Sequence, residues 1–223
     1  MRQTDGPAVA RRGFLARLSA AAGAAALLDA PTRLPAALTA PAALPLGADP
    51  DAWIARVRGR DRLILHAHQK LDRALGAAHG IRVDARDDYG VPESENGIAI
   101  AAHGPSIGGL FTDVTWKRFA LGERYGAKGA GGAPATANPF LRAGEGLPAE
   151  ATVPALMERG VVFVVCNVAV RNLARRVAGA GETPESVREA LVAGLVPGIV
   201  VVPNVFVAIA HGQQRGLGYL FID

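Results

Sequence analysis

The chain has 223 residues, of which half are apolar but only 5% are aromatic, and it contains a single cysteine, Cys166. A core of Ala, Val, Leu and Ile favours helices layered on buried strands over an aromatic-rich β-sandwich, and one cysteine excludes an internal disulfide. The formal net charge is +4, and residues 1–42, with five arginines and two aspartates, supply +3 of it. Because the rest of the chain lacks a basic tract, we expect no nucleic-acid partner.

The N-terminal segment has the order of an export signal. Arg11 and Arg12 precede Phe14-Leu15 and an Ala/Gly-rich apolar stretch, Leu18–Leu28, and this order resembles a twin-arginine signal. The stretch has 11 residues, about half of the ~20 that cross a bilayer, so no stable membrane span is expected. We therefore expect export to the periplasm through the twin-arginine translocase; an Ala-rich tail with a chance Arg-Arg pair is the alternative. Residues 1–42 are interpreted as signal peptide and start of linker, 43–60 as linker or N-terminal extension, and 61–223 as the folded domain.

The first half of that domain shows strand and helix patterns in turn. They predict an edge strand over 62–65, a helix over 67–79 ended by Gly80, a charged loop region over 82–95, a buried strand over 97–102 and a helix from about 110 to 121. Residues 126–150 are rich in Gly, Pro and Ala and predict a long exposed loop. Asn138-Pro139-Phe140 is expected to pack this loop back onto the domain, and Trp116 to be an anchor in the core or at a subunit interface.

The second half is more regular. It predicts a strand over 161–165, a helix through 168–177, a helix with Thr183 as N-cap and Pro184 at its first position, a strand over 199–202, a short helix to about His211 and a last strand over 217–222. Strands that alternate with helices imply right-handed crossovers and a parallel sheet covered on both faces. The sequence therefore predicts an α/β fold.

The lone thiol is predicted at the junction between a buried strand and a helix. Ligands of such sheets bind outside the carboxyl ends of the strands, and the start of a helix stabilises a thiolate. Arg171 is expected to add positive potential from the same helix, and Asn167 to cap it. The equally weighted alternative is that Cys166 continues the apolar strand as a small buried side chain.

Histidines supply the other candidates for chemistry. His103 follows a buried strand at its carboxyl end, so it is expected on the same sheet edge as Cys166, as a base or charge partner of the thiol or as a plain turn residue. His66 and His68, two residues apart, are weak candidates for metal ligands and are favoured as surface or capping residues. No phosphate-binding loop, nucleophile elbow or zincin motif occurs, so the sequence indicates no cofactor.

The segment Phe163–Ala169, with Cys166 at its centre, resembles the strand–cysteine–helix segment of the DsrE/DsrF-like proteins. The resemblance extends over residues 96–222 and is nearest to an exported branch of unassigned role. It implies a flavodoxin-like three-layer sandwich with a mainly parallel sheet of about five strands, and assembly into homo-oligomers. It also implies that Cys166 accepts a sulfane sulfur as a persulfide, with a sulfur donor or acceptor protein as partner. The alternative function is a non-catalytic binding or assembly module with a buried structural cysteine.

Overall fold

Five parallel strands form one sheet in the order β4-β3-β2-β1-β5. The computed structural model describes residues 49–144 and 146–223. The strands are β1 (Asp61–Ala67), β2 (Asn96–Ala102), β3 (Val162–Cys166), β4 (Val200–Val202) and β5 (Gly218–Ile222). In the register, Ala67 pairs with Ala102, Ala102 with Val165, and Cys166 with Val202. The carboxyl ends of these four strands therefore lie level along one edge of the sheet.

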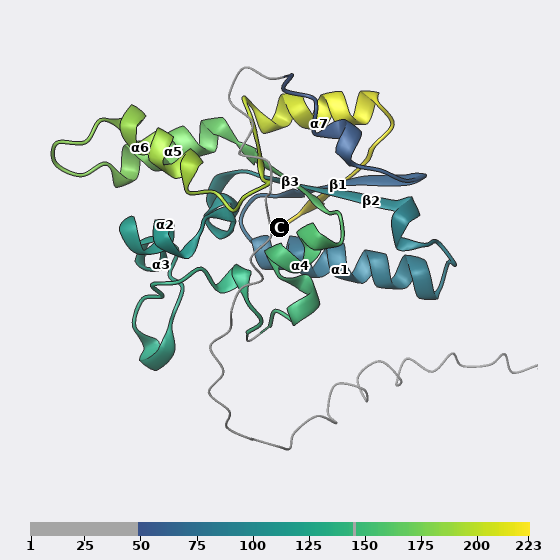
Figure 1. The fold of residues 1–223 in the computed structure, drawn as a ribbon, viewed down its shortest axis with the longest axis horizontal. Helices are drawn as coiled ribbons and strands as arrows, with labels where there is room; N and C mark the ends of the chain where they lie inside the picture. Colours follow the sequence, from purple (N-terminus) through teal and green to yellow (C-terminus); the bar gives the residue numbers. More distant parts are fainter. Residues whose placement is uncertain (1–48, 145) are drawn as a thin grey trace, which may run out of the picture. The chain divides into compact units, whose positions relative to one another are not determined.

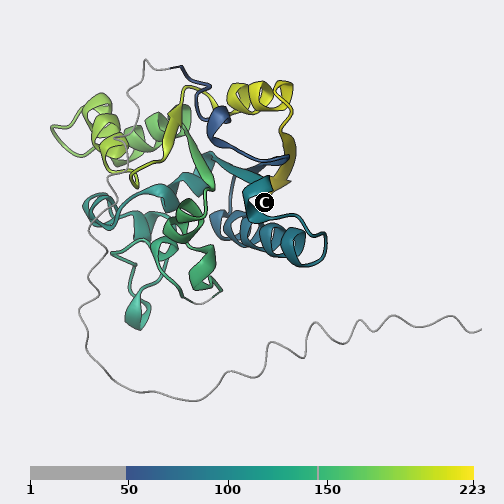
Figure 2. The ribbon, with the colours of Figure 1, turned by 45° about the vertical axis from the view of Figure 1, so that its right-hand side comes forward.

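Helices cover both faces of the sheet. The helices are α1 (Leu71–Asp87), α2 (Asp113–Arg118), α3 (Leu121–Arg124), α4 (Val153–Glu158), α5 (Asn167–Val177), α6 (Pro184–Ala193) and α7 (Val205–Gln214). Helices α1 and α4 lie on one side of the strands and α7 on the other (Figures 1 and 2), while α5 packs against α6 beside β3. The predicted flavodoxin-like three-layer sandwich with five strands is confirmed.

The core is aliphatic, as the composition predicts. Strands β2 and β3 are buried along their whole length, because helices cover both of their faces. Trp53, Ile54 and Val57, from the segment assigned to the N-terminal extension, are also buried in this core. Trp116 is 1% exposed and its Nε1 donates to the carbonyl of Gly108 at 2.8 Å, which makes it a core anchor.

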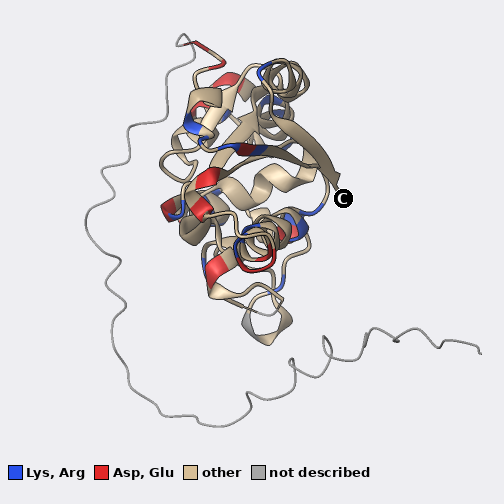
Figure 3. Cartoon of the chain, turned by 90° about the vertical axis from the view of Figure 1, so that its right-hand side faces the viewer, with Lys and Arg blue, Asp and Glu red and all other residues tan. Residues whose placement is uncertain are grey.

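Most charged residues lie on the helices and connections around the sheet (Figure 3). Within the strands they occur only at the start of β1, in Asp61 and Arg62. In the part of the chain that the structure describes, none of the helices combines the length and the apolar character that crossing a membrane requires.

Two predicted elements differ from those in the structure. The strand predicted over 62–65 is present as β1, but its predicted place at an edge of the sheet is wrong, because β1 pairs with β2 on one side and β5 on the other. The predicted helix end at Gly80 is also wrong, because α1 continues to Asp87. Five residues at helical spacing along α1 are buried, and the last of them, Arg82, lies beyond Gly80. Burial of this stripe outweighs the roughly 1 kcal/mol that a mid-helix glycine costs.

The single helix predicted over 110–121 is replaced by two short helices, α2 and α3. Ala120 separates them in a left-handed conformation with φ of 47°, which ends α2 at a position where no glycine signals a break. The loop over 126–150 has no α-helix or strand in its described residues. Asn138 anchors it as predicted: it is 0% exposed, and its Nδ2 donates to the carbonyls of Gly109 and Phe111 at 2.9 and 2.6 Å.

Candidate thiol and histidine site

The carboxyl edge of the sheet gathers the candidate residues. Cys166 is the last residue of β3, His103 follows β2, and His66 lies in β1 with His68 just beyond it. Parallel strands bring these positions to one edge because all of them end there. The predicted placement of His103 on the same edge as Cys166 is confirmed.

A pocket of about 270 Å³ opens between the start of α5 and the start of α7. Neighbouring strands β3 and β4 lead into these two different helices, and ligands of open parallel sheets bind at positions of this kind. Its lining residues are His103, Gly104, Cys166, Val168, Ala169, Asn172, Arg176, Asn204 and Phe206. The thiol and one imidazole therefore face the same small space.

Cys166 is 3% exposed and occupies the N-cap position of α5. The prediction that Asn167 caps this helix is wrong: Asn167 is its first residue, and its Oδ1 accepts a hydrogen bond from Arg188 Nη1 at 3.3 Å. The thiol lies at the end of the helix where unpaired amides and the helix dipole favour an anion.

The predicted contribution of Arg171 is not found at the pocket. Arg171 is exposed on α5 and is absent from the lining, whereas Arg176, on the same helix, belongs to it. Because α5 turns 100° per residue, the sequence could not decide which of its arginines faces the pocket until the helix was oriented. Arg176 is the cationic side chain that the pocket offers to an anion.

Three imidazoles form a connected cluster beside the thiol. His66 Nε2 lies 2.8 Å from His103 Nδ1, and His66 Nδ1 lies 2.9 Å from the hydroxyl of Tyr219. His68 stacks on His103, with ring centroids 4.4 Å apart and 13° between the planes. Phe206 meets the rings of His66 and His103 edge-on. The aromatic ring thus packs against two members of this cluster.

Burial favours the neutral forms of His66 and His103. Burial, together with the neighbouring His103 and His68, lowers the pKa of His66 from 6.5 to about 4. Burial also lowers the pKa of His103, as does His68, while the carbonyl of Ala67 acts in the opposite direction. A neutral imidazole has one N–H donor and one acceptor nitrogen. His103 therefore has one acceptor nitrogen at neutral pH.

The hydrogen-bond chain allows two sets of roles. If Tyr219 donates to His66, then His66 donates to His103 Nδ1, and His103 Nε2 carries a proton. If His66 donates to Tyr219, then His103 Nδ1 donates to His66, and His103 Nε2 is an acceptor. Only the second arrangement leaves His103 a base for the thiol, so Tyr219 and His66 control the tautomer that this chemistry needs.

The cluster is not arranged as a metal centre. Within residues 49–144 and 146–223, no three or more His, Cys, Asp or Glu side chains are grouped so as to hold a metal ion. His66 and His103 direct nitrogens at each other, and the stacked rings of His68 and His103 do not direct nitrogens at a common point. The weak candidates His66 and His68 are in the site, but as parts of a hydrogen-bonded and stacked group.

Sequence reasoning missed two further residues of this edge. Asn204 lines the pocket and its Oδ1 accepts from the amide of Phe206 at 2.9 Å, which caps α7. Tyr219 reaches His66 only because β5 pairs with β1. Pro203-Asn204 directly after a strand was a usable signal for Asn204, since Asn is a preferred N-cap. Arg11 and Arg12, the predicted signal residues, lie outside the described residues.

The fold and this edge define an α/β protein with a parallel five-stranded sheet and a thiol–histidine pocket at its carboxyl end. Compared with known proteins, the chain matches no family model, and no curated protein matches it. It is similar to a solved structure of a protein of unknown function, MTH1491 from Methanobacterium thermoautotrophicum. The two share 17% sequence identity over 72% of this chain and 98% of that one, with a TM-score of 0.40.

Proposed function

We propose that the pocket at the carboxyl edge binds a small sulfur compound and that Cys166 accepts a sulfane sulfur from it. The observation that carries this proposal is that Cys166 and His103 line one pocket of about 270 Å³, in which a neutral imidazole is available to a thiol at a helix N-terminus. The resemblance of Phe163–Ala169 to the DsrE/DsrF-like segment supports the same chemistry.

The transfer step needs no oxidant. His103 Nε2 takes the proton of the Cys166 thiol, and the thiolate attacks the outer sulfur of a donor such as thiosulfate. A new S–S bond forms on Cys166, the S–S bond of thiosulfate breaks, and sulfite leaves with the electron pair. Arg176 offers its charge to the anionic donor. An acceptor thiolate, on a sulfur partner protein, then attacks the outer sulfur of the persulfide and releases the Cys166 thiolate.

Mass spectrometry of the intact protein after exposure to thiosulfate or polysulfide tests this function. The expected result is a gain of one sulfur atom on Cys166, absent from Cys166→Ser. His103→Asn should slow the gain about a hundredfold, the typical contribution of a general base, while Arg171→Gln, exposed outside the pocket, should leave it unchanged. A wild-type protein that gains no sulfur on Cys166 would refute the proposal.

We also propose that the protein works after export, with the twin-arginine translocase as its partner in transit and a sulfur donor or acceptor protein as its partner in the periplasm. The support is the order of Arg11, Arg12 and the apolar stretch Leu18–Leu28. Cell fractionation checks this: replacement of both arginines by lysine should retain the protein in the cytoplasm.

A specific observation favours a second candidate, an assembly module. Large apolar side chains are exposed on the edge strand β5 and on the neighbouring α7. They are Phe206, Val207, Tyr219, Leu220 and Phe221, between 38% and 57% exposed. Such a grouping along an edge strand and the helix next to it is typical of a protein interface, and it supports a homo-oligomer in which this edge is covered. The molecular mass in solution tests it.

A further inference from the structure

A second pocket lies at the opposite, amino edge of the sheet and plays no part in the proposed sulfur chemistry. Its volume is about 490 Å³, within the range of pockets that hold organic ligands. It lies between the segment that leads into β1 and the starts of β2 and β3. Its lining residues are Arg56, Arg58, Arg82, Glu93, Ser94, Gly97, Met157, Arg159, Gly160, Val161 and Val162.

The pocket is strongly basic. Four arginines and one glutamate line it, a formal net charge of +3. Glu93 is already engaged by Arg159, which donates from Nε to Oε2 at 3.1 Å and from Nη2 to Oε1 at 2.7 Å. Arg86 adds a longer contact to the same carboxylate at 3.4 Å. The only carboxylate in the lining therefore has little capacity left for the other arginines.

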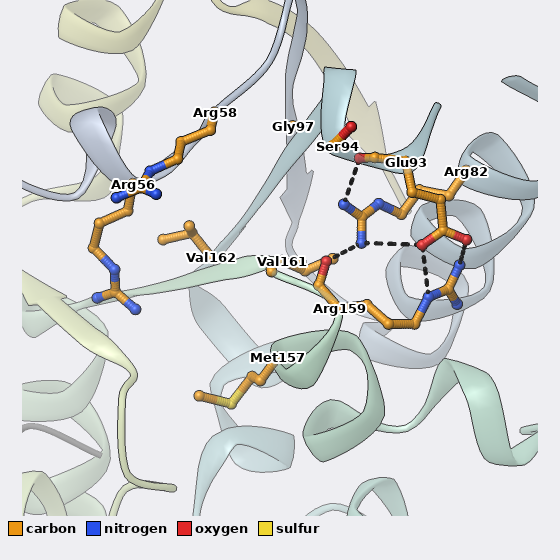
Figure 4. Close-up of a pocket in the computed structure, with 11 residues that line it drawn as sticks. Arg56, Arg58, Arg82, Glu93, Ser94, Gly97, Met157, Arg159, Val161 and Val162 are labelled. Carbon is orange, nitrogen blue, oxygen red and sulfur yellow. Dashed lines mark hydrogen bonds and ion pairs between the residues drawn. The ribbon is translucent and has the colours of Figure 1, made fainter. Parts of the chain in front are cut away.

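Arg56 and Arg58 lack ion-pair partners among residues 49–144 and 146–223. Within the described residues, Arg56 donates a single hydrogen bond, from Nη2 to the carbonyl of Gly198 at 3.3 Å. Figure 4 shows these two arginines at one side of the pocket and the group of Arg82, Glu93 and Arg159 at the other. Arg56 and Arg58 are thus the cationic groups with donors available for a ligand.

The segment that carries these arginines is fixed in place by backbone contacts. Val57, between them, is buried in the core. A Cβ on Gly97 would lie 2.1 Å from the carbonyl oxygen of Arg58, and Gly59 has φ of 108° with its own Cβ position 2.5 Å from the backbone of Glu95. Only glycine allows so close an approach. The two guanidinium groups therefore extend from a preorganised wall.

The opposite side of the pocket is also held in place, by hydrogen bonds from Arg82. The Arg82 side chain is 4% exposed, and it donates to the carbonyls of Glu93, Asn96 and Arg159. It joins α1, the turn before β2 and the turn before β3 into one unit. Burial lowers the pKa of Arg82, with Glu93 opposing the effect, yet a guanidinium stays protonated in proteins. Its charge adds to the potential inside the pocket.

The charge and the apolar surface together indicate the ligand. We propose that this pocket binds a small organic phosphate, with the phosphate group between Arg56 and Arg58 and an apolar part against Met157 and Val162. Guanidinium groups pair with phosphate oxygens in a two-pronged geometry and favour a dianion over a single charge. Met157 and Val162 lie between the two charged sides in Figure 4 and offer the apolar contact.

Calorimetry at fixed ionic strength tests the proposal, with phenyl phosphate as the probe and inorganic phosphate and benzoate as comparisons. Phenyl phosphate should bind more tightly than inorganic phosphate, which lacks the apolar part, and more tightly than benzoate, which carries a single charge. Arg56→Gln and Arg58→Gln should each weaken its binding about tenfold or more. Arg175→Gln removes one charge from the exposed face of α5 and should leave the affinity unchanged.

Three results would overturn the proposal: no binding of phenyl phosphate by the wild-type protein, equal affinity for benzoate, or equal weakening by Arg175→Gln. Arg56 and Arg58 are exposed, so their variants are expected to fold, and circular dichroism verifies it. Sulfur transfer to Cys166, measured on the same variants, should be unaffected, which separates this pocket from the thiol site.

Discussion

His66 shows how a single residue links the core to the candidate site. It is 3% exposed, in the middle of a hydrogen-bond chain from Tyr219 to His103. An imidazole at this depth loses hydration when it is charged, and the nearby His68 and His103 add repulsion to the same effect. The fold therefore holds His66 in its neutral form, and through it sets the tautomer of His103.

This burial predicts an acid-sensitive fold. Between pH 6.5 and about 4, the unfolded chain binds a proton at His66 that the folded chain does not, so the free energy of unfolding rises with pH across this window. The free energy of unfolding is therefore highest above pH 6.5. It falls by at most about 3 kcal/mol as the pH approaches 4. Urea unfolding at a series of pH values measures this change.

His66→Gln should flatten the pH dependence of stability while keeping hydrogen bonds to both neighbours. The control variant His79→Gln should retain the pH dependence of the wild type. A steep, unchanged pH dependence in His66→Gln would contradict the assignment.

At the scale of elements, two glycines illustrate opposite roles. Gly97 is the second residue of β2 and lies against the backbone of Arg58, so a side chain there would collide with a carbonyl. Gly76 lies inside α1, and a Cβ at that position would meet no atom within 4 Å. The same residue type therefore supports a close backbone approach in one place and only weakens a helix in the other.

The matched substitutions Gly97→Ala and Gly76→Ala should change stability in opposite directions. Gly76→Ala is expected to raise the free energy of unfolding by about 0.5–1 kcal/mol, because alanine loses less backbone freedom in a helix. Gly97→Ala is expected to lower it by about 2 kcal/mol or more, because the segment with Arg56 and Arg58 must move away. Urea denaturation of both variants gives the comparison. Equal effects of the two substitutions would argue against the close approach at Gly97.

At the scale of the whole molecule, the strand order leaves β5 at an edge of the sheet. One side of β5 pairs with β1, and in the described part of the chain its other side pairs with no strand. Tyr219 and Phe221 point toward the face that carries His66, since both rings lie near its imidazole. An unpaired edge with apolar side chains is a surface that proteins normally cover.

Leu220 tests whether another copy of the chain covers this edge. Its side chain is 45% exposed, so Leu220→Lys should fold normally and block edge-to-edge association through its charge. We expect sedimentation analysis to show an oligomer for the wild type and a smaller species for Leu220→Lys. Val114→Lys, at a site that is 78% exposed on α2, is the control and should retain the wild-type mass. A monomeric wild type would contradict the proposal that this edge mediates assembly.

Much of the candidate site follows from sequence because it depends on where strands end. Cys166 and His103 each come directly after a buried apolar run, and parallel strands bring such positions to one edge. The residues that depend on pairing between distant strands or on helix rotation were not predictable. Tyr219 reaches His66 through the β1–β5 pairing, and Arg176 rather than Arg171 faces the pocket because of the orientation of α5.

The sequence by itself determined the fold class, the placement of the thiol at a strand–helix junction and the edge it shares with His103, since these follow from local apolar periodicity and chain direction. Only the tertiary structure decided the strand order, the histidine cluster and the basic pocket around Arg56 and Arg58. The physical reason is that strand order, burial and charge proximity are relations between segments far apart in the chain. No local pattern of side chains encodes them.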